Sequence, residues 1–268
     1  MLEDNKSYLK DLNEAQLNAV LKTDGPSMVI AGAGSGKTRV LTYKIVHLVE
    51  NGVDPFEILA LTFTNKAARE MKLRISSMIG ESESKNIWMG TFHSVFAKIL
   101  RFEAHKIGFT SDFTIYDTQD SERLISSIIK EKALDKDVYR PKSIRNRISS
   151  LKNNFITVNG YFANNELVES DNLSRKPETG NIYKEYSERL IKSNSMDFDD
   201  LLMKTNELLN NHPEVLAKYQ EKFKYILVDE YQDTNNSQYL IVKSLSDKYQ
   251  NICVVGDDAP VSYTHLRA

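Results

Sequence analysis

The sequence predicts an α/β fold in which a parallel β-sheet carries helices on both faces and is interrupted by an inserted all-α domain. The first observation is a set of short apolar, β-branched runs, each as long as a buried strand, at residues 27–31, 58–63, 87–91, 225–228 and 252–255. The second is helical periodicity between the first three runs, where Leu41, Ile45 and Leu48 share one helix face. Alternating strands and helices are typical of parallel sheets that bind nucleotides.

The middle of the chain follows a different pattern. From residue 113 to residue 197 the strand signals fade, and polar helical segments such as residues 117–130 alternate with Asn-rich turns. The strand pattern resumes at residue 225. We therefore expect one sheet domain formed by residues 1–112 and 198–259, and a helical domain inserted as residues 113–197.

Composition limits the class of protein. The chain has 268 residues, 41% hydrophobic and 27% charged, with a net charge of −2; this is typical of a globular protein and excludes a collagen-like or disordered one. Cys253 is the single cysteine and lies in an apolar run, so we expect a buried thiol, no disulfide framework and a reducing cytoplasm. Residues 1–16 lack a signal-peptide pattern, and no apolar run approaches the roughly 20 residues of a membrane span. Near-neutral charge leaves a nucleic-acid partner possible, because basic residues along one groove attract phosphates.

A glycine-rich segment, residues 31–38, lies between the first predicted strand and the first long helix. Its glycines let successive backbone N–H groups point at a polyphosphate, and the following helix adds its positive end. Lys37 would then reach the β- and γ-phosphates, and the Thr38 hydroxyl would bind Mg²⁺. The strict phosphate-loop pattern has glycine where this chain has Ala31, which is tolerable if φ stays negative. The alternative, a flexible turn with an exposed lysine, fits the strand–loop–helix context less well.

Two adjacent carboxylates, Asp229 and Glu230, follow the apolar run 225–228. Successive strand side chains point in different directions, so one carboxylate can hold Mg²⁺ while the other orients or deprotonates an attacking water. Taken alone, the segment also fits a solvated strand end with surface acids. Its combination with Lys37 favours phosphoryl transfer to water.

Six motifs occur in an order and spacing that resemble the superfamily 1 DNA helicases of the UvrD, Rep and PcrA type. They are LNEAQ, the phosphate loop, LTFTNKAA, GTFHS, DEYQDT and VGDDA, at residues 12–16, 31–38, 61–68, 90–94, 229–234 and 255–259. The resemblance implies a RecA-like P-loop NTPase, and an ATP-driven motor that moves 3′ to 5′ along single-stranded DNA and separates duplex, in DNA repair or replication. Its implied partners are single-stranded DNA and single-strand/duplex junctions, and its cofactors are ATP and Mg²⁺.

The resemblance also implies roles for individual residues. Lys37, Asp229 and Glu230 would be catalytic, with Thr38 and Asp229 on Mg²⁺ and Glu230 activating water. Gln16 would read the adenine edge, although Asn13 and Gln16 also fit a helix-capping box. The complete implied ATP-binding set is Gln16, Ala31, Gly32, Ala33, Gly34, Ser35, Gly36, Lys37, Thr38 and Arg39.

The implied contacts with single-stranded DNA follow the second and third strands, where open α/β sheets place their ligands. They are Thr62, Phe63, Thr64, Asn65, Thr91 and His93. Residues 63–65 also fit an ordinary strand-to-helix cap, and Phe92 favours the core. A basic stretch in the insertion could contact duplex phosphates or form a solvated face; it comprises Arg140, Lys142, Arg145, Arg147 and Lys152.

The family pattern includes a second motor domain, whose arginines complete the ATP site, and this sequence contains no counterpart. Because an arginine finger contributes about 10³- to 10⁵-fold to hydrolysis in related enzymes, we expect weak ATP binding and very slow hydrolysis by this chain alone. Pro260 stands where the family has a glutamine, so we interpret residues 260–268 as foreign to the gene, which sequencing the locus would test. Two alternatives remain open: the helicase portion of a recombination helicase–nuclease, and a non-hydrolysing module that binds ATP or single-stranded DNA.

Overall fold

The computed structural model describes residues 7–32 and 34–257. Its contacts divide the chain into two compact units, each described here by itself. The first unit is Met1–Val95, Pro213–Thr234 and Val242–Ala268, and the second is Phe96–His212 and Asn235–Ile241. The second unit therefore extends beyond residues 113–197 on both sides.

The first unit alternates strands and helices, as the sequence predicts. Helix α5 starts in it and continues into the second unit, and α13 runs in the opposite sense, from the second unit into the first. The elements are η1 (Ser7–Asp11), α1 (Glu14–Leu21), β1 (Ser27–Ile30), α2 (Lys37–Glu50), η2 (Pro55–Glu57), β2 (Ile58–Thr62), α3 (Asn65–Ile79), α4 (Glu81–Asn86), β3 (Trp88–Thr91), α5 (Phe92–Glu103), α12 (Pro213–Lys222), β6 (Tyr225–Val228), η4 (Tyr231–Asp233), α13 (Asn236–Ser246) and β7 (Ile252–Gly256).

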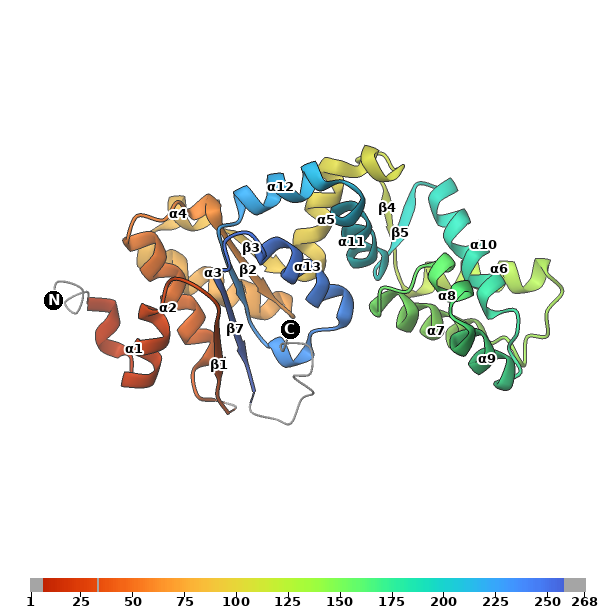
Figure 1. The fold of residues 1–268 in the computed structure, drawn as a ribbon, viewed down its shortest axis with the longest axis horizontal. Coiled ribbons are helices and arrows are strands. Elements are labelled where there is room, and N and C mark those ends of the chain that lie inside the picture. Colours follow the sequence, from red (N-terminus) through yellow and green to blue (C-terminus); the bar gives the residue numbers. More distant parts are fainter. Residues whose placement is uncertain (1–6, 33, 258–268) are drawn as a thin grey trace. The chain divides into compact units, whose positions relative to one another are not determined.

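The five strands form one sheet in the order β1-β7-β6-β2-β3, and every neighbouring pair is parallel (Figure 1). Each predicted apolar run is one of these strands, with ends that differ by at most one residue. The prediction of a parallel α/β sheet is therefore confirmed.

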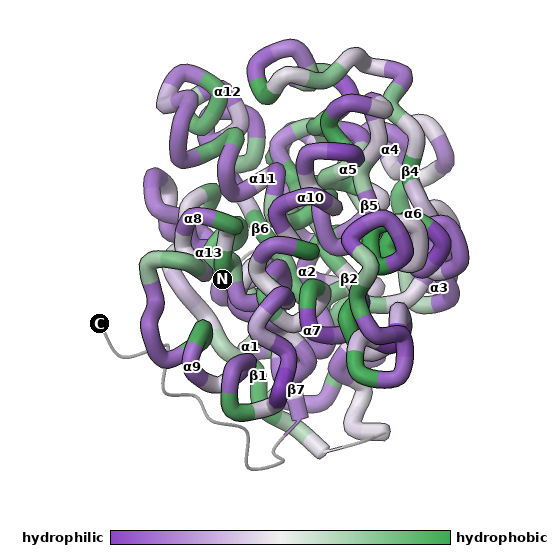
Figure 2. Tube along the Cα trace, turned by 90° about the vertical axis from the view of Figure 1, so that its right-hand side faces the viewer, coloured by the Kyte–Doolittle hydropathy of each residue, from purple (hydrophilic) through white to green (hydrophobic). Residues whose placement is uncertain are grey.

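Burial on both faces explains why the runs that form the central strands β7, β6 and β2 read as continuous apolar segments. All five residues of β2 are buried. Helices α2 and α3 cover one face, where Leu41, Ile45, Met71 and Ile75 pack in one cluster with β2 and β7 residues. Cys253 belongs to the same cluster and is buried, as expected. Figure 2 shows hydrophobic residues along the strands and mixed hydropathy along the helices.

The second unit is mostly helical and has its own core. Buried residues of α6, α7 and α10, including Ile125, Ile148 and Tyr183, form that core. Its elements are η3 (Ala104–Ile107), β4 (Thr114–Tyr116), α6 (Thr118–Glu131), α7 (Pro141–Asn153), α8 (Val158–Ala163), α9 (Asn165–Leu173), α10 (Thr179–Lys192), β5 (Ser195–Asp197) and α11 (Asp200–Asn211).

The sequence expectation of a wholly helical insertion missed one feature of this unit. Strands β4 and β5 pair in parallel, with Thr114 opposite Ser195. Each strand has only three residues, which is too short to show an alternating pattern. Helix α11 packs on α7 and β5, so the unit reaches past residue 197.

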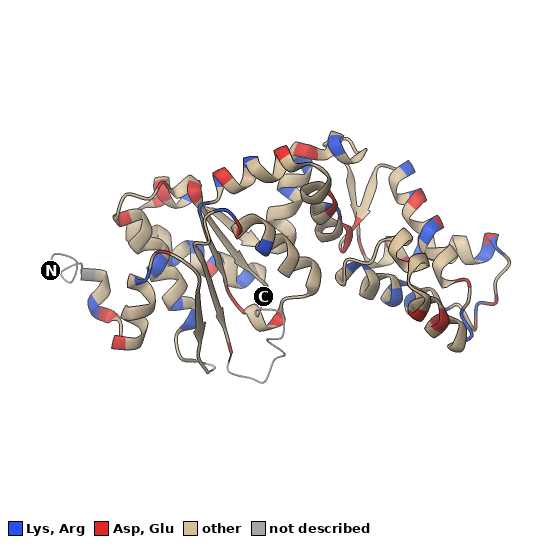
Figure 3. Cartoon of the chain, viewed as in Figure 1, with Lys and Arg blue, Asp and Glu red and all other residues tan. Residues whose placement is uncertain are grey.

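Charged residues of both signs lie on the helices and loops, whereas the strands carry few (Figure 3). Within the described part of the chain, no helix is both long enough and apolar enough to cross a membrane.

Candidate nucleotide-binding site

Parallel pairing brings the ends of the five strands to one edge of the sheet. Ile30 lies opposite Gly256, and Thr62 lies opposite Thr91. The β6–β2 and β6–β7 registers place the residue after Val228 between these two pairs. The carboxyl edge of a parallel sheet is where α/β proteins bind ligands. The phosphate loop, the acidic pair and both predicted DNA-contacting segments therefore begin at the same edge.

The loop between β1 and α2 uses two of its glycines in a conformation that favours glycine. Gly34 and Gly36 adopt φ values of 78° and 89°, which L side chains rarely tolerate. Gly32 is not in the positive-φ region, so its backbone conformation does not by itself require glycine. Ala31 also avoids positive φ, and its N–H donates to the Gly256 carbonyl at 3.1 Å. Alanine is thus compatible with this position. The predicted contact at Ala33 lies outside the described residues.

Lys37 begins helix α2 and is only 9% exposed. Its Nζ donates to the carbonyl oxygens of Ala31 at 2.9 Å and Gly32 at 3.2 Å, and it forms an ion pair with the Asp257 carboxylate. The side chain therefore folds back over the loop. A turn with an exposed lysine, the alternative considered from sequence, is wrong.

Asp229 follows β6 and is 1% exposed, which rules out a surface acid at this position. Its backbone N–H continues the sheet by donating to the Leu61 carbonyl at 3.0 Å, and its carboxylate accepts a hydrogen bond from the Thr38 hydroxyl at 3.1 Å. Burial, and secondly the charge of Glu230, raise the pKa of Asp229. A hydroxyl and a buried carboxylate side by side are the oxygen ligands that Mg²⁺ prefers, so this pair fits the expected metal.

Glu230 has a left-handed backbone, with φ 49°, which is strained for a residue with a long side chain. Its N–H donates to Asp229 Oδ1 at 3.0 Å, and its carboxylate accepts a hydrogen bond from Gln232 Nε2 at 2.6 Å. The Gln232 Oε1 accepts in turn from the Asp257 N–H at 3.0 Å. Gln232 and Asp257 lie inside the motifs quoted from sequence but were given no role there. Only their spatial neighbours reveal these contacts.

Gln16 joins helix α1 to the phosphate loop. The capping box is present: the Asn13 side chain accepts from the Gln16 N–H at 2.9 Å, and Gln16 Oε1 accepts from the Asn13 N–H at 3.2 Å. The other end of the same amide donates from Nε2 to the Ser35 carbonyl at 2.9 Å. A Cβ at Gly36 would come within 2.8 Å of this Nε2. The capping-box interpretation is therefore confirmed, and the same side chain contacts the phosphate loop; the adenine-reading role of Gln16 stays a prediction.

Arg39 lies in the first turn of α2, beside a cavity of about 510 Å³. Its guanidinium is 5.3 Å from the centre of the Tyr43 ring and forms a loose ion pair with Asp11 at 3.8 Å. Tyr8 and Arg74 line the same cavity. Aromatic rings beside an arginine suit a flat base, so the cavity is compatible with the role expected for Arg39.

The residues after β2 combine a structural role with exposure. Thr62 is buried and donates from its hydroxyl to the Thr64 carbonyl at 3.2 Å. The Thr64 hydroxyl caps α3 by accepting from the Ala67 N–H at 3.1 Å, so the cap interpretation is correct. Phe63 is half-buried with its ring 5.5 Å from that of Phe92. Thr64 and Asn65 are exposed at the helix start.

The residues at the end of β3 and the start of α5 differ in burial. Phe92 is 1% exposed, as the core interpretation predicts. The Thr91 hydroxyl accepts from the Ser94 N–H at 3.3 Å. His93 is half-buried, and burial lowers its pKa to about 4. Its imidazole is therefore neutral at physiological pH.

We expect His93 to make folding sensitive to acid. The unfolded chain binds the histidine proton near pH 6.5 and the folded chain only near pH 4, so the free energy of unfolding falls as pH falls through this window. Between pH 7 and pH 4.5, wild type should lose about 2 kcal/mol more than His93→Gln. Urea unfolding at both pH values measures the difference. Parallel losses in the two proteins would contradict the neutral, buried imidazole.

The basic stretch in the second unit does not form one uniform surface. Lys152 is 1% exposed and pairs with Asp197 at 2.7 Å and Asp200 at 2.8 Å, so its expected place in a phosphate-binding surface is wrong. Arg145 pairs with Glu122, and Arg147 pairs with the buried Asp171, both at 3.1 Å. The two exposed members are Arg140 and Lys142, at the start of α7.

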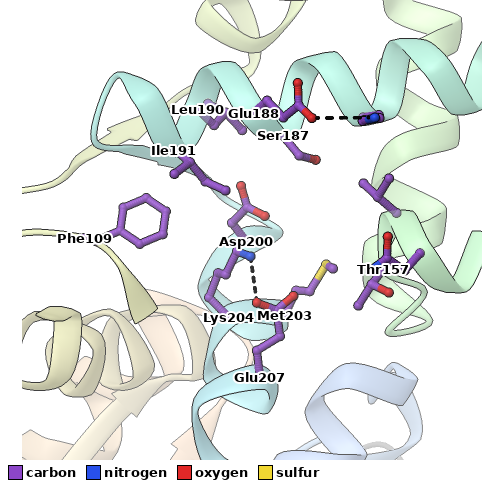
Figure 4. A pocket seen from close by; sticks show the side chains of 13 residues that line it. Phe109, Thr157, Ser187, Glu188, Leu190, Ile191, Asp200, Met203, Lys204 and Glu207 are labelled. Atoms are coloured by element: carbon purple, nitrogen blue, oxygen red, sulfur yellow. Dashed lines mark hydrogen bonds and ion pairs between the residues drawn. The ribbon is translucent and has the colours of Figure 1, made fainter. Parts of the chain in front are cut away.

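The second unit also contains a pocket of about 280 Å³ (Figure 4). Phe109, Ile191 and Met203 give it apolar walls, and Lys204 and Glu207 form an ion pair at 2.7 Å on its edge. None of the site residues expected from sequence lines it. Asp200 lines it as well, but this carboxylate is bound to Lys152.

The glycine-rich loop between a strand and a helix, on an all-parallel sheet, defines the class of P-loop NTPases. Sequence comparison identifies the family within this class. The UvrD/REP helicase N-terminal domain matches residues 12–267, and the chain belongs to that family. The match includes residues 260–267, which lie outside the described part of the structure; their foreign origin stays a prediction.

Several curated proteins are similar to this chain. It is 47% identical over 256 residues to the ATP-dependent DNA helicase PcrA of Bacillus subtilis, covering 93% of this chain and 33% of that protein. It is 45% identical over 252 residues to the PcrA proteins of Staphylococcus epidermidis and Staphylococcus aureus, covering 94% of this chain and 34% of each. The chain therefore spans about a third of the length of these relatives.

Proposed function

We propose that this chain is the amino-terminal motor portion of an ATP-dependent 3′ to 5′ DNA helicase that acts in DNA repair or replication in the cytoplasm. One observation carries the proposal: Lys37, Thr38 and Asp229 meet at the carboxyl edge of the sheet, directly beside Glu230. Family membership supports the helicase activity, because the similar PcrA proteins are ATP-dependent DNA helicases.

In this proposal the chain's residues divide the work of hydrolysis. The N–H groups of Gly32, Gly34 and Gly36 and the Lys37 ammonium hold the phosphates of ATP, with Gln16 and Arg39 at the adenine base. Thr38 and Asp229 hold Mg²⁺, which would neutralise charge that develops on the phosphate oxygens. Glu230 orients the attacking water and accepts its proton.

The proposed contacts with single-stranded DNA lie on the same edge of the sheet. Thr64, Asn65 and Thr91 offer hydroxyl and amide groups to the sugar-phosphate backbone of the DNA. The neutral His93 ring can stack on a base or hydrogen-bond to it. We call Thr64, Asn65, Thr91 and His93 the DNA-binding rim. Thr62 supports it through its hydrogen bond to the Thr64 carbonyl, and Phe63 through its ring contact with Phe92. Arg140 and Lys142 are the members of the basic stretch best exposed for duplex phosphates, with Arg145 and Arg147 engaged by carboxylates beside them.

Binding of labelled single-stranded DNA tests this proposal. We expect weak binding whose affinity falls about tenfold between 50 and 200 mM salt, because two or three phosphate contacts give a shallow salt dependence. Asn65→Asp should weaken binding at least fivefold by placing a negative charge on the rim, while that charge at the start of α3 favours the helix. Fluorescence anisotropy measures both effects.

The matched control is Ser82→Asp, which adds the same charge on α4 at the opposite edge of the sheet. It should leave DNA binding within twofold of wild type. Equal effects of the two aspartates would point to a general charge effect, and absence of binding at 50 mM salt would reject a DNA-binding rim in this chain.

A further inference from the structure

Gln232 uses both ends of its side-chain amide to join two strand ends. Its Nε2 donates to Glu230 Oε2 at 2.6 Å, and its Oε1 accepts from the Asp257 N–H at 3.0 Å. Glu230 follows β6 and Asp257 follows β7, its parallel neighbour. The amide therefore fixes the Glu230 carboxylate against the end of the adjacent strand.

Gly256 leaves room for this amide. A Cβ at residue 256 would approach Gln232 Oε1 to 2.9 Å, whereas the next nearest atoms, the backbone nitrogens of Gln232 and Tyr231, would lie at 3.6 and 3.8 Å. Gly256 has no positive φ, so its backbone conformation does not require glycine. The position of the Gln232 side chain does explain the small residue.

A glutamate side chain has three rotatable bonds, and a general base acts only from a restricted set of orientations. We propose that Gln232 is a positioning residue that holds the Glu230 carboxylate in its working orientation, and that Gly256 admits the amide that does so. This inference rests on the proposed function, in which Glu230 orients water. Because Glu230 Oε2 accepts the hydrogen bond from Gln232, Glu230 Oε1 is the oxygen that would accept a hydrogen bond from the attacking water.

The first test uses truncation and displacement of the same amide. Gln232→Ala and Gly256→Ala should each slow ATP hydrolysis about tenfold with KM for ATP changed less than twofold, because neither residue donates to Lys37 or Thr38. Since both substitutions remove the same contact, the one between Gln232 and Glu230, the double variant should hydrolyse ATP no more slowly than either single variant. Additive losses, or loss of ATP affinity alone, would overturn the proposal.

The second test changes the charge of the amide while keeping its length. Gln232→Glu still offers an acceptor to the Asp257 N–H but places a carboxylate against Glu230, and two carboxylates at such a distance must share a proton. The acid limb of the pH–rate profile should therefore move to higher pH by at least one unit. Gln119→Glu, at an exposed position of α6, is the control and should leave the limb in place. An unmoved limb in Gln232→Glu would refute positioning.

A third measurement does not depend on turnover. ADP with aluminium fluoride and Mg²⁺ mimics the transferring phosphate with its attacking water, so Gln232→Ala and Gly256→Ala should bind this mixture about tenfold more weakly than wild type while binding ADP equally. Equal affinity for the mimic in all three proteins would overturn the proposal. Persistence of hydrolysis in Lys37→Ala would instead reject the proposed function, which separates the two failures.

Discussion

Replacing Lys37 by alanine should lower ATP hydrolysis about 100- to 1,000-fold. Lys37 is the buried cation of the phosphate loop, held by two loop carbonyls and Asp257, and removing one preorganised donor from a phosphoryl or acyl transfer site costs a factor of this size. Slow turnover is measured with the protein in excess over radiolabelled ATP, in the presence of single-stranded DNA. The affinity for a fluorescent ATP analogue should fall in parallel.

Lys85→Ala is the matched control for this experiment. Lys85 is exposed and pairs with Glu81 one helical turn away, an interaction of little energetic weight, so hydrolysis should stay within twofold of wild type. Hydrolysis by Lys37→Ala at the wild-type rate would reject the phosphate-loop assignment. Urea unfolding of both variants shows whether a loss of activity reflects a loss of folding.

The substitution Lys152→Met should lower the free energy of unfolding by about 3–5 kcal/mol. Lys152 is 1% exposed and neutralises Asp197 and Asp200, while the Tyr186 hydroxyl donates to Asp197 at 2.9 Å. Removing the lysine leaves two carboxylates buried without a cation. Lys130→Met, at an exposed position of α6, should change stability by less than about 0.5 kcal/mol. Urea unfolding measures both, and a loss below 1 kcal/mol in Lys152→Met would contradict the buried ion cluster.

The same variant has a predictable pH dependence. In the wild-type protein, burial and the neighbouring Asp197 raise the pKa of Asp200 from 3.8 to about 6, whereas Lys152 lowers the pKa of Asp197. Without Lys152 both carboxyl groups hold protons more tightly when folded than when unfolded, so the free energy of unfolding rises as pH falls toward 4. The deficit relative to wild type should therefore be smaller at pH 5 than at pH 8. A deficit that is constant with pH would contradict uncompensated carboxylates.

The central strands of the sheet could be predicted from sequence because they are buried on both faces. Ile58 to Leu61 is an uninterrupted apolar run, and the half-exposed edge strand β1 is still apolar from Met28 to Ile30. The pair of β4 and β5 could not be predicted, since three residues such as Thr114–Tyr116 carry no period. The order of strands along the sheet depends on contacts far apart in sequence, such as Ser27 with Cys253, and no local pattern encodes it.

The site divides in the same way. Residue type and spacing identify the loop and the acidic pair, because phosphate and metal chemistry constrain which side chains can act there. Spacing could not show that Lys37 reaches Asp257 or that Gln232 reaches the Asp257 N–H, since these partners are more than 20 residues apart. For the basic stretch, the sequence suggested a shared role for residues that the structure places in different environments. Lys152 looks like its exposed neighbours in sequence, and only the buried Asp197 and Asp200 distinguish it.

The left-handed backbone at Glu230, together with the role in hydrolysis proposed for its carboxylate, sets stability against activity at a single position. Glycine would relax that conformation, and asparagine tolerates it better than glutamate does. Either would remove the carboxylate. We therefore expect screens that select for thermal stability alone to replace Glu230 among their first changes. The selected variants should have a higher free energy of unfolding and, under the proposed function, little or no ATP hydrolysis.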